Sequence, residues 1–204
     1  MKLFLFDFDG VLVESLNIYE KTVTTTLEKV NKPLTGGREE FLELFEDNFY
    51  ASLIKKGVDL KKFVAASVDV LDKVDYKTMQ PVAGIIPVLR KLQENNILLV
   101  ISSNNTKTIQ RALARFKSDE LFQEVLGSDF LLSKRDKIKY VTDKYQIAPA
   151  DVYYIGDTTG DIKESKQAGV KTIGITWGWH SKEKITSAAP DYVFEQPNDL
   201  LQLN

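Results

Sequence analysis

The chain has 204 residues, of which 43% are hydrophobic and 27% charged, and its formal net charge is −2. This length suits one core domain with a sizeable insertion and is too short for two large domains. The near-neutral balance argues against a protein that holds nucleic acid by bulk electrostatics, because such proteins carry a strong basic excess.

Cysteine is absent from the chain, and histidine occurs once, at His180. The lack of thiols excludes disulfides, Cys-ligated zinc, iron–sulfur clusters and a cysteine nucleophile. One imidazole cannot supply a three-histidine metal site or a two-histidine facial triad. Any catalysis must therefore rest mainly on carboxylates, lysines and hydroxyls.

The first apolar stretch, residues 2–6, is too short for a secretory signal and is interrupted at once by acidic residues. No apolar run approaches the roughly 18 residues that a membrane-spanning helix needs. We therefore expect a cytoplasmic protein that binds neither membrane nor nucleic acid, while the sequence leaves its oligomeric state open.

Short apolar runs recur along the chain, as is typical of strands buried on both faces of a parallel sheet. They lie at residues 2–6, 97–101, 152–155, 171–175 and 192–194. Apolar residues at helical spacing occupy most of the intervals, and Gly169 is placed to end a helix over residues 161–168. This alternation predicts an α/β fold with a parallel, Rossmann-like sheet core and right-handed crossovers.

Residues 14–80 interrupt the alternation, because they contain no good strand. Apolar stripes with helical spacing run through residues 16–30, 41–53 and 60–74, with breaks at Lys32-Pro33 and Lys56-Gly57. They predict a helical domain inserted after the first strand, with its own apolar core. The expected division is a core domain of residues 1–13 and 81–204 and a helical domain of residues 14–80.

Asp7 and Asp9 lie two residues apart at the carboxyl end of the first predicted strand. Residues with this spacing point the same way on an extended chain, and the carboxyl ends of parallel strands are where α/β sheets bind ligands. Two carboxylates that emerge together from a buried strand are costly unless a cation meets them. The pair therefore indicates a functional site, and a solvated turn is the weaker alternative.

A second polar cluster, Ser102, Ser103, Asn104 and Asn105, directly follows the strand at residues 97–101. Its hydroxyl and amide groups precede a helix expected to start near Thr106, and free helix N–H groups suit an anion. Helix capping by Asn104 or Asn105 explains the same residues equally well, so this cluster alone does not define a site.

Two further clusters follow later strands. The basic residues 134–139 form a solvated helix start from which one lysine could turn inward toward an anion. Asp157 and Asp161 follow the strand at residues 152–155, and Asp161 is also a candidate helix cap. Because the ends of parallel strands converge on one edge, Asp7, Asp9 and Asp157 supply hard oxygen ligands of the kind that Mg²⁺ prefers.

Taken in order, these clusters resemble the four motifs of the haloacid dehalogenase-like hydrolase superfamily, in the phosphoglycolate-phosphatase-type branch with a helical cap. The first motif is similar to residues 7–11 (DFDGV), the second to Ser102, the third to Lys134, and the fourth to Gly156-Asp157 with Asp161. Ser103 is the alternative to Ser102, and Lys137 is the alternative to Lys134.

The resemblance implies a Mg²⁺-dependent phosphatase that hydrolyses a small phosphorylated metabolite through an aspartyl-phosphate. It implies Asp7 as nucleophile and Asp9 as general acid and base, with the Asp9 main-chain carbonyl on the metal. The implied residue sets are catalytic Asp7, Asp9, Ser102 and Lys134; substrate-binding Ser102, Ser103, Asn104 and Lys134; and metal-site Asp7, Asp9, Asp157 and Asp161.

Several alternatives stay open within that superfamily. Asp9 favours phosphoryl transfer over dehalogenation, because haloacid dehalogenases lack an acid two residues after the nucleophile. A sugar-phosphate mutase would use the same aspartate pair, whereas a non-catalytic binding protein would typically have lost an acid or the lysine. A phosphonatase needs a Schiff-base lysine in the cap, and no local pattern around Lys21, Lys29 or Lys32 supports one.

Two single residues are also ambiguous. Arg38 follows Gly36-Gly37, and it either begins a solvated helix or contacts the non-phosphate part of a substrate. His180 follows Trp177-Gly178-Trp179, a segment whose simplest interpretation is a core aromatic residue with a turn; a hydrogen bond from His180 to a substrate is the weaker interpretation.

Overall fold

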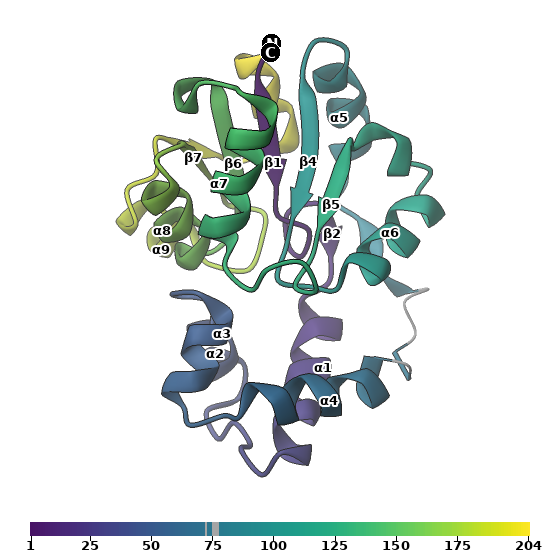
Figure 1. Cartoon of the computed structure of the whole chain (residues 1–204), viewed down its shortest axis with the longest axis vertical. Coiled ribbons are helices and arrows are strands. Elements are labelled where there is room, and N and C mark those ends of the chain that lie inside the picture. Colours follow the sequence, from purple (N-terminus) through teal and green to yellow (C-terminus); the bar gives the residue numbers. More distant parts are fainter. Residues whose placement is uncertain (72, 75–77) are drawn as a thin grey trace.

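The computed structural model describes residues 1–71, 73–74 and 78–204, and it places a helical insertion at one end of an α/β body (Figure 1). The body holds a parallel sheet of six strands in the order β5-β4-β1-β6-β7-β8. The strands are β1 (Leu3–Phe6), β4 (Ile97–Ile101), β5 (Glu124–Leu126), β6 (Val152–Gly156), β7 (Lys171–Ile175) and β8 (Tyr192–Phe194). The predicted α/β fold is thereby confirmed.

Helices cover both faces of this sheet because its strands are apolar on both sides. Phe4 and Phe6 pack toward α5 and α6, whereas Leu3 and Leu5 pack toward α7, and all four side chains are fully buried. Burial of each such side chain contributes about 1.5–3 kcal/mol. The helical elements of the body are α5 (Ile85–Gln93), α6 (Thr106–Arg115), η2 (Asp119–Leu121), α7 (Lys134–Tyr145), η3 (Pro149–Asp151), α8 (Thr159–Ala168), α9 (Lys182–Ser187) and η4 (Pro197–Leu203).

The helical insertion leaves and rejoins the body through a short antiparallel ribbon, in which β2 (Val13–Glu14) pairs with β3 (Gln80–Pro81). It comprises α1 (Leu16–Lys29), α2 (Gly37–Glu43), α3 (Phe49–Lys55) and α4 (Leu60–Leu71). As predicted, it has an apolar core of its own, in which Leu27, Phe41 and Leu53 are fully buried.

Two local predictions differ from the structure, and a third agrees with it. Residues 14–80 were predicted to contain no strand, but the ribbon places Glu14 and Gln80 in strands of two residues each. Strands this short do not produce a periodic sequence pattern. The stripe over residues 41–53 is two helices, because the Asn48 side chain accepts a hydrogen bond from Ala51 N and so begins α3 as a new helix. The predicted Gly169 helix end is confirmed, with a φ of 82°.

Main-chain carbonyls of the insertion contact the start of α8, in addition to side-chain contacts such as that of Asn48 with Glu164. Gly160 N donates to the Phe45 carbonyl over 2.9 Å, and the Thr159 hydroxyl donates to the Glu46 carbonyl over 3.2 Å. The contact is close, because a Cβ added at Gly160 would overlap the Asp47 carbonyl oxygen and lie 2.7 Å from that of Phe45. Glycine at this position therefore lets the insertion approach the body.

Both chain termini lie at the end of the sheet opposite the insertion (Figure 1). The carboxyl ends of the parallel strands consequently face the insertion, and the site lies between the two parts. Among the residues that the structure describes, no helix has both the length and the apolar character that crossing a membrane requires.

The Gly160→Ala substitution should loosen this attachment. Alanine favours a helix interior over glycine by up to about 1 kcal/mol, so any loss of stability must come from the overlap with the insertion. We expect faster hydrogen exchange and proteolysis within residues 44–48, measured by mass spectrometry, together with a lower melting temperature. Gln167→Ala, at an exposed position of α8, is the matched control. Unchanged exchange in residues 44–48 would contradict the structural role given to Gly160.

Candidate active site

Asp7 and Asp9 leave the end of β1, between the neighbouring strands β4 and β6. Both side chains are buried, with 5% of each residue exposed. Gly10 turns the chain with a φ of 79°, and a Cβ there would overlap the Asp157 carboxylate. Glycine is therefore required for the loop after β1 to pass against Asp157, which comes from the end of β6.

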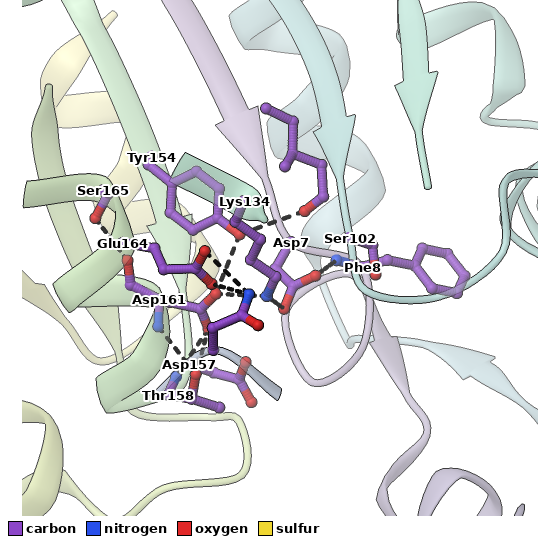
Figure 2. A network of polar contacts seen from close by, with 12 residues as sticks. Asp7, Phe8, Ser102, Lys134, Tyr154, Asp157, Thr158, Asp161, Glu164 and Ser165 are labelled. Atoms are coloured by element: carbon purple, nitrogen blue, oxygen red, sulfur yellow. Dashed lines mark hydrogen bonds and ion pairs between the residues drawn. The ribbon is translucent and has the colours of Figure 1, made fainter. Parts of the chain in front are cut away.

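Lys134 connects the first and fourth motifs. Its Nζ donates to Asp7 Oδ2 over 2.7 Å and to Asp161 Oδ1 over 2.6 Å, in a buried environment (Figure 2). Lys134 begins α7, and the Ser133 side chain caps that helix by accepting from Asp136 N. Of the two candidate lysines, the structure brings Lys134 to the Asp7 carboxylate.

Lys137 lies one helical turn further along α7 and is fully buried. Its Nζ donates to the main-chain carbonyl of Ser102 over 2.5 Å. Burial, followed by the charge of Lys134, lowers the Lys137 pKa from 10.5 to about 7. The two candidates of the third motif thus have different contacts, one with a carboxylate and one with the loop after β4.

Three carboxylates gather where a cation could bind. Asp7, Asp157 and Asp161 each offer one oxygen atom, and these atoms lie within 4.8 Å of one another. Asp157 Oδ2 accepts from Trp179 N over 2.7 Å, but its Oδ1 is buried without a hydrogen-bond partner. Asp9 Oδ1 is likewise buried and unpartnered. Buried carboxylate oxygens without donors indicate a missing cation or ligand.

Asp161 differs from the other two, because both of its oxygens are hydrogen-bonded. Oδ1 accepts from Lys134 and from the Tyr154 hydroxyl at 3.1 Å, while Oδ2 accepts from the Thr158 amide and hydroxyl at 3.1 and 2.7 Å. Thr158 is the N-cap of α8, and Asp161 completes its capping box. The expectation that Asp161 contributes to helix capping therefore agrees with the structure, with Thr158 as the capping residue itself.

Burial determines the electrostatics of the site. It raises the Asp9 pKa from 3.8 to about 7, with a further contribution from the Asp7 charge, and it raises the Asp7 pKa against the opposing effect of Lys134. Burial and the neighbouring carboxylates hold the Asp157 pKa well above its ordinary value. For Asp161, Lys134 and hydrogen bonds outweigh burial and lower the pKa. One lysine ammonium cannot neutralise this many buried carboxylates.

The loop after β4 places the second cluster in contact with the first. The Ser102 hydroxyl accepts from Asn104 N over 3.1 Å, and Asn104 Nδ2 donates to Asp9 Oδ2 over 3.1 Å. Asn105 caps α6 by accepting from Lys107 N. Asn104, predicted as a substrate-binding residue, is thus positioned to orient the Asp9 carboxylate.

A small chamber lies where the four motifs meet. From the body, its walls are Asp7, Asp9, Ser102, Ser103, Lys134, Asp157, Thr158 and Trp179, and from the insertion they are Tyr19 and Phe45. Most of the predicted catalytic and substrate-binding residues line this chamber. Asn104 and Asp161 do not line it but contact residues that do.

Arg38 and His180 make structural contacts outside the chamber. Arg38 pairs with Glu20 at 2.7 Å and so joins α2 to α1. His180 Nδ1 accepts from Thr159 N, and its Nε2 faces the Leu42 carbonyl, each over 3.1 Å. Because one ring nitrogen accepts and the other can donate, the imidazole is neutral, and burial lowers its pKa.

Some residues of the site had not been predicted. Thr158 could have been found, because a threonine three residues before Asp161 is a capping-box pattern. Tyr154 lies inside an apolar strand, and the Trp179 contact is made by a main-chain amide, so neither has a sequence signal. The ring of Trp179 packs against Tyr19 and Phe45 of the insertion, with centroids 5.3 and 5.0 Å away.

Comparison with known proteins agrees with this site. Residues 4–175 match the model of the haloacid dehalogenase-like hydrolase family. The phosphoglycolate phosphatase of Synechococcus elongatus is 28% identical, covering 99% of this chain and 96% of the relative, and that of Haemophilus influenzae strain 86-028NP is 29% identical, covering 99% and 97%. The structure of a predicted phosphatase from Clostridium acetobutylicum has the same fold, with a TM-score of 0.81 and 23% identity over 98% of this chain and 96% of that one.

This chain belongs to the haloacid dehalogenase-like hydrolase family. The match covers all four motifs and most of the chain, so the resemblance inferred from those motifs is confirmed. Both curated relatives named above are phosphoglycolate phosphatases, in agreement with the branch that the motifs indicated.

The raised Asp9 pKa predicts a pH-dependent stability of the metal-free protein. Between pH 3.8 and about 7 the folded state keeps a proton that the unfolded state has lost. The stability that protonated Asp9 provides is therefore complete below pH 3.8 and is lost as the pH rises through 7. Relative to Asp9→Asn, which cannot ionise, the wild-type free energy of unfolding should fall by on the order of 4 kcal/mol over this range.

Urea denaturation in EDTA at several pH values measures this difference. The control is Asp151→Asn, an exposed substitution in η3 just before the amino end of β6, whereas the site lies at the carboxyl ends of the strands. A constant difference between wild type and Asp9→Asn from acidic to neutral pH would show that Asp9 titrates alike in the folded and unfolded states.

Proposed function

We propose that this protein is a Mg²⁺-dependent phosphatase that hydrolyses a small phosphomonoester through an aspartyl-phosphate on Asp7. The observation that carries the proposal is the contact of Lys134 with Asp7, in a chamber that Asp9 and Asp157 also line. A nucleophile, a proton carrier, a cation and a metal-binding carboxylate then lie around one small space. The phosphatase names of the relatives support hydrolysis over the mutase alternative.

The donor set fits Mg²⁺, which prefers oxygen ligands and retains waters. Asp7 and Asp157 would hold the ion together with the main-chain carbonyl of Asp9. Asp161 would support it indirectly, because its oxygens are already engaged by Lys134 and Thr158. When bound, the metal supplies positive charge that reduces repulsion between the phosphate and the carboxylates.

In the first step, an Asp7 carboxylate oxygen attacks phosphorus, and the bond from phosphorus to the leaving oxygen breaks. The Asp9 carboxyl gives its proton to that oxygen, so the leaving group departs as a neutral alcohol. A pKa near 7 leaves a large fraction of Asp9 protonated at neutral pH, as a general acid requires. Lys134 and the Ser102 loop would bind the phosphoryl oxygens throughout.

In the second step, Asp9 takes a proton from water, and the hydroxide attacks the aspartyl-phosphate. Phosphate leaves and Asp7 is restored as a carboxylate. The Asn104 amide, which donates to Asp9 Oδ2, would hold the Asp9 side chain in place for both proton transfers. The same residue thus serves as acid and then as base.

We further propose that residues 14–80 act as a cap domain over a core of residues 1–13 and 81–204. Tyr19 and Phe45 of the insertion form part of the chamber wall, which supports this division. A cap in this position would exclude water from the phosphate and limit the size of the substrate.

Magnesium binding should be detectable without turnover. Adding Mg²⁺ after EDTA should raise the melting temperature, because a ligand at about 100 times its Kd stabilises the folded state by about 2.7 kcal/mol. Asp157→Asn should abolish this shift while leaving the metal-free protein at least as stable, since it removes a buried charge. Differential scanning calorimetry measures both effects, with Asp151→Asn as control. An equal Mg²⁺ shift in Asp157→Asn would rule out Asp157 as a ligand.

Asp7 and Asp9 should be separable by pre-steady-state kinetics. Asp9→Asn should release a burst of aryl alcohol from an aryl phosphate, at most one per active site, because that leaving group needs no proton. Later turnover should be slower by about 10²–10⁴-fold, since no base activates water. Asp7→Asn should give no burst, because it lacks the nucleophile. With Asp9→Asn, alkyl phosphates should give little burst, because their leaving group needs a proton. If Asp9→Asn with metal bound hydrolyses alkyl phosphates at the wild-type rate, Asp9 is not the proton carrier.

A further inference from the structure

A second cavity adjoins the chamber, and the two share Asp9, Tyr19 and Ser103 as wall residues. It has a volume of about 160 Å³ and lies between α1 and α4 of the insertion and the loop after β4. The cavity begins at Asp9, the residue that would protonate the leaving oxygen. A substrate with its phosphate against Asp7 would therefore extend its leaving group past Asp9 into this cavity.

The described part of the cavity wall carries little charge. Among the described residues that line it, Asp9 is the one carboxylate, and none is lysine, arginine or histidine. Lys21, Lys29 and Lys73 line a different hollow between α1 and α4, which Asp9 does not border. Much of the wall is apolar, with Ile18, Val23, Phe49, Phe63, Val68 and Met79 among its residues.

Several hydroxyl groups of the wall donate their protons to the main chain. Thr22 Oγ1 donates to the Ile18 carbonyl over 2.8 Å, and Ser67 Oγ donates to the Val64 carbonyl over 2.7 Å. Thr26 makes the same kind of bond, to the Thr22 carbonyl over 2.7 Å. A hydroxyl that donates to the main chain offers a ligand its lone pairs alone, so it attracts a donor and repels an anion.

Ser15 adds an independent observation. It lines the cavity, 1% of the residue is exposed, and its buried hydroxyl lies near the Asp9 carboxylate, whose pKa it lowers, without making a hydrogen bond of normal length. A ligand hydroxyl at this point would give Ser15 a full hydrogen bond. The wall is therefore matched to a ligand that is largely apolar and carries a hydroxyl group.

We infer that the leaving group is an uncharged alcohol with an apolar body of about six carbon atoms and a further hydroxyl. The cavity excludes leaving groups that carry a carboxylate. This inference rests on the proposed phosphatase function. A cavity of this volume holds a molecule about the size of benzene. Phosphoglycolate would place a carboxylate where no described cation meets it, at a high desolvation cost. The substrate class of this chain thus differs from the one in its relatives' names.

Matched substrates test the inference. With 4-(hydroxymethyl)benzyl phosphate and 4-carboxybenzyl phosphate, the leaving group is a primary benzylic alcohol in both, and the charge of the distal group is what changes. We expect kcat/KM to favour the neutral substrate by at least about tenfold, which corresponds to about 1.4 kcal/mol. The smaller pair of 2-hydroxyethyl phosphate and phosphoglycolate should show the same preference. Equal values, or a preference for the carboxylates, would overturn the inference.

Binding separates this inference from the proposed function. The corresponding benzylphosphonates cannot be hydrolysed, and their affinities in the presence of Mg²⁺ can be measured by calorimetry. Tighter binding of the neutral phosphonate without turnover of any phosphate ester would support the preference of the cavity for an uncharged group and reject the phosphatase. Turnover with a preference for the carboxylate substrates would support the phosphatase and reject the inference about the leaving group. Failure to bind either phosphonate would show that the cavity does not hold the leaving group.

A charge introduced at the cavity gives the reciprocal test. Val64 lines the cavity from α4 and is 50% exposed, so a polar residue there should not disturb folding. Val64→Lys should improve kcat/KM for 4-carboxybenzyl phosphate about tenfold or more relative to Val64→Gln, which has similar length but no charge. If Val64→Lys and Val64→Gln have the same kcat/KM for 4-carboxybenzyl phosphate, the absence of a cation is not the reason that carboxylates are excluded.

Discussion

Lys134 shares its ammonium between Asp7 and Asp161, and the rest of the site depends on that shared contact. It joins the end of β1, the start of α7 and the start of α8 at one point (Figure 2). Even so, among the described residues, buried negative charge exceeds buried positive charge, because Asp9 and Asp157 form no ion pair with a lysine. Water cannot relieve this imbalance, so protons or a metal ion must do so. The excess of buried negative charge destabilises the metal-free fold, but it would also give the protein its affinity for Mg²⁺. Burial and the same excess keep a large fraction of the Asp9 carboxyl group protonated near neutral pH.

Main-chain geometry holds the least compensated of these carboxylates in place. Gly10 and Gly178 both lie against Asp157, and a side chain on either one would overlap its carboxylate or Cβ. Asp157 also accepts from the Trp179 amide, so one of its oxygens is fixed while the other stays available. A ligand oxygen that is held this way needs little reorganisation when a cation binds. Because two loops and a strand end hold the Asp157 carboxylate through their backbone, its position is less sensitive to side-chain motion elsewhere.

Much of the fold and the identity of the strand-end acids could be predicted, because parallel strands bring their carboxyl ends to one edge regardless of details. The sequence could not decide whether Lys134 or Lys137 is the lysine that contacts Asp7. The two lysines lie about one turn apart on α7, and both are buried. Only the structure shows that Lys134 reaches Asp7, whereas Lys137 contacts the Ser102 carbonyl. The split between α2 and α3 was missed because the stripe over residues 41–53 keeps its spacing through the break. The chemistry of the second cavity depends on neighbours from distant segments, so periodicity carries no information about it.

The attachment of the insertion through main-chain carbonyls has an evolutionary consequence. The carbonyl oxygens of Leu42, Phe45 and Glu46 would be present whatever side chains those positions carried, so mutation leaves these acceptors intact. Residues of α1 and α4 that line the second cavity can therefore be exchanged while the helices keep their position over Asp9. Descendants of one ancestral chain could acquire new substrates by drift in these two helices, with the reaction chemistry inherited unaltered. In a laboratory, the same two helices are where a library of variants would most economically search for new specificities.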